Sequence, residues 1–76
     1  MLRIKYNVDL KELEKFGFEK YGDSYAQEVD AYCLMIIDGS SRRIEVDFEV
    51  GYYGIDLYNN ILFNLIQAGF VEKVED

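Results

Sequence analysis

The longest patterned stretch of this chain is residues 56–69, where apolar side chains recur at helical spacing. From Leu57 to Val71 there is no charged residue, although 30% of the chain is charged. Apolar residues spaced three and four positions apart indicate an amphipathic helix. We expect Asp56 to be its N-cap and Gly69 to be the left-handed residue that ends it. The sequence therefore predicts a long helix around which the core is organised.

A helical wheel divides this predicted helix into two halves. One half is apolar and is expected to face the core: Leu57, Tyr58, Ile61, Leu62, Leu65, Ile66 and Ala68. The other half carries uncharged amides and one aromatic ring, where an ordinary surface helix carries Lys and Glu. Charged residues are depleted at the cores of interfaces. We therefore predict a contact surface formed by Phe63, Asn60, Asn64 and Gln67; the alternative is an ordinary outward face with one exposed aromatic residue.

Alternating apolar and polar residues predict β-strands elsewhere in the chain. The alternation is clearest over residues 2–8 and 43–50. In the second segment Ile44, Val46, Phe48 and Val50 are expected on one face, and Arg43, Glu45, Asp47 and Glu49 on the other. Residues 18–21 and 25–37 are also predicted to be strands, separated by a turn at Gly22-Asp23-Ser24. Residues 70–74 form either a short closing strand or a packed tail.

A short helix is predicted over residues 10–16. Asp9 is a favourable N-cap, and Glu12 three residues later completes a pattern similar to a capping box. Gly17 suits the left-handed position just past the end of such a helix, with Phe18 packing back on it. The apolar side of this helix is formed by Leu10, Leu13 and Phe16.

The turn Asp38-Gly39-Ser40-Ser41 has the composition of a hairpin, but two strand registers are compatible with it. In a three-residue loop the side chains aligned with Ile44, Val46 and Phe48 are those of Tyr32, Leu34 and Ile36. In a four-residue loop the side chains aligned with the same three residues are those of Ala31, Cys33 and Met35. Because a slip of one residue exchanges the two faces of a strand, the sequence leaves both registers open.

Size and composition limit what this chain can be. Its 76 residues predict one domain over residues 1–76, which buries only ~60% of its unfolded surface. Small domains often gain stability from disulfides, a metal or a partner. Cys33 is the only cysteine and there is no histidine, so an internal disulfide is excluded and a Cys/His zinc site is not expected. Efficient packing or self-association therefore remains as the source of additional stability.

The net charge of −7 argues against binding to nucleic acids or anionic membranes, because both require Lys and Arg. No apolar run approaches the ~20 residues of a membrane span. Residues 1–6 alternate where a signal peptide would have a continuous apolar core. Together with the single cysteine, this pattern predicts a cytoplasmic protein.

The sequence offers little for catalysis. Without histidine, the common general base is missing, and the usual Ser-His-Asp and Cys-His arrangements cannot form. Cys33 lies in an apolar segment, where burial would make its thiol inert. There is no glycine-rich phosphate loop. We expect a protein that is not an enzyme and that has no cofactor or metal; a small carboxylate enzyme is the least favoured alternative, because it needs an enclosed pocket.

Three carboxylates, Glu45, Asp47 and Glu49, are expected on one strand face. Such oxygen clusters bind hard cations weakly, but no calcium-loop spacing accompanies them. A solvated strand face is the simpler interpretation. Arg3 and Lys5 on the first strand are candidate cross-strand partners, which would make the cluster an ion-pair ladder.

Tyr52 and Tyr53 are expected on a loop between Gly51 and Gly54, before the long helix. Tyrosine is favoured at interfaces because it gives a large contact area at a low entropic cost. The two rings are therefore candidate contact residues. Alternatively, one covers the edge of the core and the other is merely exposed.

Residues 13–20 and 65–73 share the order helix, glycine, phenylalanine and then Glu-Lys. We attribute this similarity to shared helix-ending chemistry rather than to duplication. Residues 9–18 and 65–74 together resemble short uncharacterised proteins of Gram-positive bacteria and their prophages, with a helix-Gly-Phe opening and a Leu-Ile-x-x-Gly-apolar-Val close. The resemblance implies a small phage-associated or accessory protein of unknown function, and it carries over no catalytic or ligand residues.

The fold predicted from these patterns is α+β. A small antiparallel sheet of three to four strands carries a short N-terminal helix and a longer C-terminal helix on one face. The predicted function is a non-enzymatic protein-interaction module that forms a homodimer through the 56–69 helix. The alternative is an acidic inhibitor of a nucleic-acid-binding host enzyme, whose phosphate-mimicking charges are Glu28, Asp30, Glu45, Asp47 and Glu49.

Overall fold

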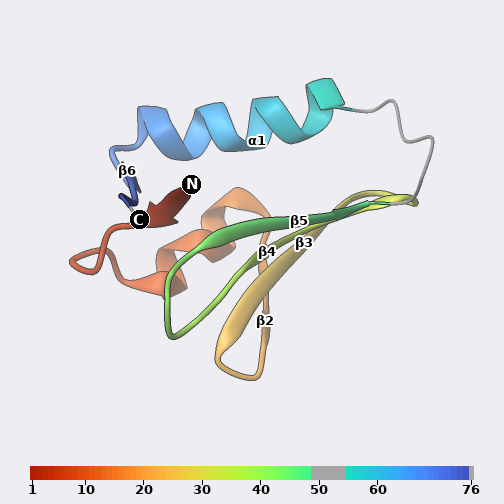
Figure 1. Cartoon of the computed structure of the whole chain (residues 1–76). Helices are drawn as coiled ribbons and strands as arrows, with labels where there is room; N and C mark the ends of the chain where they lie inside the picture. The colour runs from red at the N-terminus through yellow and green to blue at the C-terminus, as the bar shows by residue number, and fades with distance from the viewer. Residues whose placement is uncertain (49–54, 76) are drawn as a thin grey trace.

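The computed structural model describes residues 1–48 and 57–75. For residues 55 and 56 it describes the backbone alone. Within these ranges the main sheet is an antiparallel meander of four strands in the order β2-β3-β4-β5. Its strands are β2 (Glu19–Tyr21), β3 (Ser24–Asp30), β4 (Cys33–Ile37) and β5 (Ile44–Phe48). Figure 1 shows the helix α1 (Ile55–Gln67) crossing above this meander. The α+β class predicted from the sequence is confirmed.

The two ends of the described chain form a second, smaller sheet. Here β1 (Leu2–Ile4) pairs antiparallel with β6 (Val71–Lys73), with Arg3 opposite Glu72. Residues 70–74 therefore contain a closing strand and are not merely a packed tail. The N–H of Ile4 donates to the carbonyl of Arg42 at 2.8 Å, and Arg3 forms a β-bridge with Arg43. These contacts join the small sheet to the start of β5.

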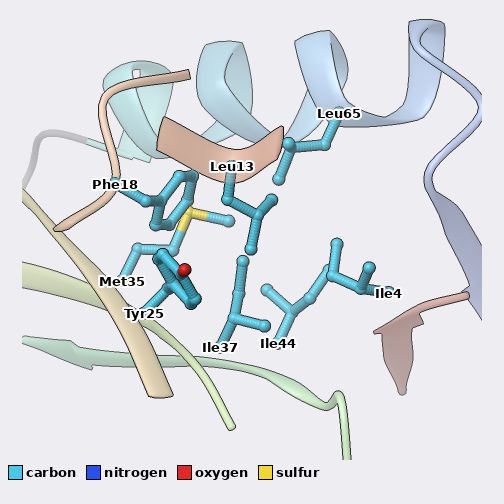
Figure 2. Packing of buried hydrophobic residues seen from close by; sticks show 8 residues of the cluster. All are labelled: Ile4, Leu13, Phe18, Tyr25, Met35, Ile37, Ile44 and Leu65. Carbon is cyan, nitrogen blue, oxygen red and sulfur yellow. The ribbon is translucent and has the colours of Figure 1, made fainter. Parts of the chain in front are cut away.

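Among the described residues, one hydrophobic core lies between the main sheet and the helices. Figure 2 shows Leu13 between Leu65 of α1 and the sheet residues Met35 and Ile37. All four are completely buried. The core draws on every layer of the fold and contains Ile4, Leu13, Phe18, Tyr25, Met35, Ile37, Ile44 and Leu65. Because these residues come from distant parts of the sequence, the fold depends on long-range packing.

The predicted N-terminal helix is present over η1 (Leu10–Phe16), but it is a 3-10 helix rather than an α-helix. Its apolar residues are spaced by three, which aligns them on one side of a helix with about three residues per turn. Asp9 caps it as predicted, accepting from the N–H of Lys11 at 3.0 Å. The predicted capping box does not form; the Glu12 carboxylate pairs with Lys15 at 2.7 Å instead.

The single strand predicted over residues 25–37 is wrong. The structure divides it into β3 and β4, with a tight turn at Ala31 and Tyr32. The carboxylate of Asp30 accepts from the N–H of Tyr32 at 2.7 Å, and the pairing register shifts between Glu28 and Asp30. An aspartate that binds the backbone two residues later favours a turn. Apolar composition alone did not reveal this break.

The hairpin between β4 and β5 adopts the four-residue alternative. The N–H of Asp38 donates to the carbonyl of Arg43 at 3.1 Å, which leaves residues 39–42 as the loop. Met35 therefore lies opposite Val46, and Cys33 opposite Phe48. The opposite face of β4 carries Leu34 and Ile36. Arg42 ends the loop in a left-handed conformation, with φ of 66°.

The described helix α1 begins at Ile55, two residues before the predicted first residue Leu57, so Asp56 is its second residue and not its N-cap. It contacts η1, and only a narrow strip of it is covered. Leu65 is buried, and Tyr58, Ile61 and Leu62 are half-buried. The prediction that Leu57, Ile66 and Ala68 face the core is wrong, because all three are exposed. The physical reason is that the core packs against one side of the helix only, which carries Tyr58, Ile61, Leu62 and Leu65, and leaves the flanking positions uncovered.

Candidate functional site

The first candidate surface is the half of α1 that faces away from the core. We define the α1 outer face as Asn59, Asn60, Phe63, Asn64, Ile66 and Gln67, all of which are exposed. Phe63 is 56% exposed and Ile66 47% exposed. These two residues are three positions apart and are therefore neighbours on the helix surface. The structure thus places the four predicted helix residues on one exposed face that contains no charge.

Local structure fixes the direction of this face. Gly69, with φ of 77°, ends α1 in a left-handed conformation, as predicted. The N–H of Gly69 donates to the carbonyl of Ile66, and the N–H of Phe70 donates to that of Leu65. This pair of bonds is the Schellman arrangement. Because Leu65 is completely buried at the same end, the helix cannot rotate without exposing it.

Tyr58, toward the other end of the described helix, is half-buried and packs against the core. Partial burial raises the pKa of the Tyr58 hydroxyl above its ordinary value, and the nearby Cys33 thiol adds to this effect. Cys33 itself is buried, as predicted. The predicted contact residues Tyr52 and Tyr53 lie outside the residues that the structure describes.

The second candidate surface is the face of the main sheet that points away from the core. Side chains alternate between the two faces of a strand, so the register assigns each residue to a face. One cross-strand row contains Glu19, Ala26, Ile36 and Glu45, and the next contains Glu28, Leu34 and Asp47. We define the outer sheet face as these seven residues. Its centre is apolar, and its four carboxylates are exposed.

Three of the predicted carboxylates, Glu28, Glu45 and Asp47, are thus brought together on this face. Asp30 is not part of it, because its carboxylate holds the β3–β4 turn. Glu49 lies outside the described residues. Among the described residues no group of three or more Cys, Asp and Glu residues is arranged to hold a metal ion.

The predicted ion-pair ladder between the first strand and the carboxylates of residues 45–49 is wrong at Glu45 and Asp47, and Glu49 lies outside the described residues. Arg3 pairs instead with Glu72 of β6 at 2.6 Å. The direct cross-strand neighbours of Glu45 and Asp47 on β4 are Ile36 and Leu34. The reason is the closing strand β6, which supplies a nearer carboxylate to Arg3 across the small sheet.

A third group of residues, around Tyr6, is structural. The Arg42 guanidinium donates to the carbonyls of Val8 at 2.7 Å and Lys5 at 3.1 Å. The guanidinium carbons of Arg3 and Arg42 lie 4.8 and 5.5 Å from the centre of the Tyr6 ring. These cation–π contacts and hydrogen bonds fix the β1–η1 connection against the hairpin loop. Sequence analysis did not identify Arg42, because nothing in its neighbourhood marks a left-handed residue.

Sequence analysis also missed Glu19, Ala26, Leu34 and Ile36 as part of a surface. The signal for them was the four-residue hairpin register, which turns Leu34 and Ile36 away from the core beside Asp47 and Glu45. That register was one of two open alternatives. Phe63, in contrast, could be identified from helical spacing alone.

Two general findings complete the description of the candidate surfaces. Within the described part of the chain, no helix is long and apolar enough to cross a membrane. Comparisons of the chain with protein families, with curated proteins and with solved structures found no match.

Proposed function

We propose that this protein is a small, non-enzymatic interaction module that forms a homodimer through the α1 outer face. The observation that carries the proposal is the exposure of Phe63 and Ile66 on a helix face without charge. Exposed apolar side chains that lie together, bordered by amides, are typical of contact surfaces. A lone aromatic side chain would be unremarkable, but here its neighbour in the next turn is also apolar.

The length of the face suits a pair of antiparallel helices. Asn60 and Gln67 lie on either side of Phe63 and are separated by about 10 Å along the helix axis. A two-fold axis near Phe63 brings the two Phe63 rings together. It also places Asn60 of each copy beside Gln67 of the other. Amide side chains both donate and accept hydrogen bonds, so such pairs satisfy each other.

The remaining features of the proposal come from composition. The absence of histidine supports a function other than acid-base catalysis. A single cysteine, buried and unpaired, suits the reducing conditions of the cytoplasm, which we propose as the location. The resemblance of the chain ends to prophage proteins adds the proposal of an accessory role.

Light scattering coupled to gel filtration tests the dimer. Phe63→Asp introduces a charge at the proposed centre, and we expect it to convert the dimer into a monomer of unchanged helix content. Tyr32→Asp is the matched control, because Tyr32 is 58% exposed but lies in the β3–β4 turn. A wild-type protein that stays monomeric at high concentration, or a Phe63→Asp variant that still dimerises, would contradict the proposal.

A second candidate function is inhibition of a nucleic-acid-binding enzyme by the carboxylates of the outer sheet face. The specific observation in its favour is the shared face of Glu28, Glu45 and Asp47. Titration of a basic nucleic-acid-binding enzyme at low and high salt tests this candidate. We expect binding that weakens with salt and in the Glu45→Gln/Asp47→Asn variant. Unchanged enzyme activity at low salt would eliminate it.

A further inference from the structure

The outer sheet face is hollowed between β2 and β4. The hollow has a volume of about 270 Å³ and is lined by Glu19, Tyr21, Ala26, Glu28 and Leu34, with Gly17 and Gln27 at its end. Ala26 is buried, yet it does not belong to the core cluster. Its small side chain forms the floor because larger residues surround it on both neighbouring strands. The depression therefore results from an alanine at this place in the register.

The lining of the hollow combines apolar walls with carboxylates. Tyr21 is 62% exposed and Leu34 is 37% exposed. Glu19 lies opposite Ala26, and Glu28 follows Ala26 by two residues on the same strand. The two glutamates are thus diagonal cross-strand neighbours, about 7–8 Å apart. The Tyr21 hydroxyl donates to the Glu19 carboxylate at 3.4 Å, which turns that carboxylate toward the ring.

This combination suits a long cationic side chain. Lys and Arg bury their apolar stems while their charged heads stay near water or a carboxylate. A stem that rests on Ala26 and Leu34 leaves the head between Glu19 and Glu28. The Tyr21 ring adds a surface on which a guanidinium can stack. An arginine satisfies all three contacts at once, because its planar head donates in several directions.

We propose that the outer sheet face binds a basic segment of a protein partner, with one arginine or lysine side chain in this hollow. Beyond the hollow, Leu34 and Ile36 continue the apolar strip toward β5, and Glu45 and Asp47 border its far side. Adjacent strands are about 4.8 Å apart, so Glu28 and Asp47 lie about 10 Å apart across β4. That width matches the diameter of a helix with its side chains.

The charge of the outer sheet face favours a basic protein segment over nucleic acids, anionic membranes and metal ions. Four exposed carboxylates repel the phosphates of nucleic acids and anionic membranes. The described carboxylates do not form a metal-binding group. A basic segment that also carries apolar residues is complementary to both features of the face. The inference stands on the sheet alone and does not depend on self-association through α1.

The test uses a capped synthetic peptide that contains arginine and leucine, with titration calorimetry of the full chain. The same peptide with citrulline in place of arginine keeps the shape and removes the charge. Ala26→Leu fills the hollow without changing any charge, and Ala31→Leu is its control in the exposed β3–β4 turn. Glu28→Gln removes one rim carboxylate, and Glu14→Gln removes an exposed carboxylate of η1.

We expect Glu28→Gln to weaken binding of the arginine peptide about tenfold, as the loss of one charge-assisted contact predicts. Ala26→Leu should weaken it by about the same factor, because the added side chain occupies the hollow that would hold the arginine stem. The two control variants and the wild type should bind alike, and the citrulline peptide should bind at least as weakly as the variants. Equal losses in the control variants, binding unaffected by Ala26→Leu, or no binding at all would overturn the proposal.

Self-association measured on the same variants separates this proposal from the dimer. Ala26→Leu should remain as dimeric as the wild type, whereas Phe63→Asp should still bind the peptide. Loss of the dimer in Ala26→Leu would show that a second copy occupies the sheet face, and would overturn the assignment of a separate partner.

Discussion

The N–H of Phe70 donates a hydrogen bond to the carbonyl of Leu65, 3.1 Å away, across the left-handed Gly69. Phe18 makes the equivalent bond to Leu13 at 3.2 Å, across the left-handed Gly17. Both leucines are completely buried. The two helices therefore end in the same motif. In each motif, the leucine whose carbonyl accepts this bond has its side chain in the same core.

Replacing either glycine tests how much these ends contribute. An L-residue in the left-handed region costs about 1–2 kcal/mol. Gly69→Ala should cost about that amount, because a β-carbon there meets nothing within 4 Å. Gly17→Ala should cost slightly more free energy of unfolding, because its β-carbon would lie 2.8 Å from the Gln27 side-chain nitrogen and this flexible side chain would have to move. Urea denaturation measures the free energy of unfolding of both variants.

Gly22→Ala is the control for this comparison. Gly22 has φ of 59° and open space around it, but it lies in the β2–β3 turn rather than at a helix end. The decrease in the free energy of unfolding in Gly22→Ala should resemble that in Gly69→Ala. If Gly17→Ala were no more destabilising than the other two, the contact with Gln27 would have no energetic role.

Such helix ends were predictable from the sequence because their signal is local. Glycine at the left-handed position and an apolar residue after it lie within one short segment. The break between β3 and β4 also has a local cause, the Asp30 side chain, but the apolar run over residues 31–37 that follows it hid the break. The hairpin register was undetermined, because either loop length satisfied the local pattern.

The extent to which α1 is buried is a non-local property. Leu57 and Leu65 have the same side chain and lie on the same predicted apolar half, yet Leu57 is 48% exposed and Leu65 is fully buried. The difference is that Leu65 belongs to the buried core cluster, whereas Leu57 is not among the residues packed against it. A wheel records the direction of each side chain, but it contains no information about the width of the supporting surface.

A pair of leucine substitutions tests this asymmetry. Leu65→Ala should lower the free energy of unfolding by about 3 kcal/mol, through lost burial and a residual cavity. Leu57→Ala should lower it by less than about 1 kcal/mol, because the site is largely solvated. Both replacements have the same effect on helix propensity, so denaturant midpoints can be compared directly. Similar losses would show that Leu57 is packed in solution.

Substitutions of Arg42 separate its backbone conformation from its side-chain contacts. Arg42→Ala loses the bonds to the carbonyls of Lys5 and Val8 and keeps the left-handed strain. Arg42→Gly loses the same bonds but relieves the strain. We therefore expect Arg42→Gly to be more stable than Arg42→Ala by about 1 kcal/mol in thermal or urea denaturation. Equal stabilities would mean that the loop relaxes out of the left-handed region.

Arg42→Lys provides the complementary measurement. Lysine retains the positive charge near Tyr6, but its compact ammonium group does not reproduce the planar fork of the guanidinium. The Arg42→Lys variant should therefore fall between the wild type and Arg42→Ala. Stability equal to the wild type would show that charge alone holds the β1–η1 connection.

The final prediction concerns pH and the carboxylate of Asp38. The N–H groups of Ser41 and Ser40 each donate to Asp38 Oδ1 at 2.8 Å, and these bonds hold the pKa of Asp38 below its ordinary value of 3.8. A pKa that is lower in the folded state contributes stability above the unfolded-state pKa. That contribution is lost as the pH falls through the folded-state pKa.

Asp38→Asn removes this titration while keeping a side-chain oxygen that accepts hydrogen bonds. At neutral pH the wild type should be more stable than Asp38→Asn, and the difference should shrink as the pH falls below about 4. The difference between the two proteins is the quantity to measure, because the many other carboxylates titrate in both. NMR titration of the Asp38 side chain gives its folded-state pKa directly. A stability difference that is constant from pH 7 to the acid limit would mean that the two N–H groups do not favour the ionised form of Asp38.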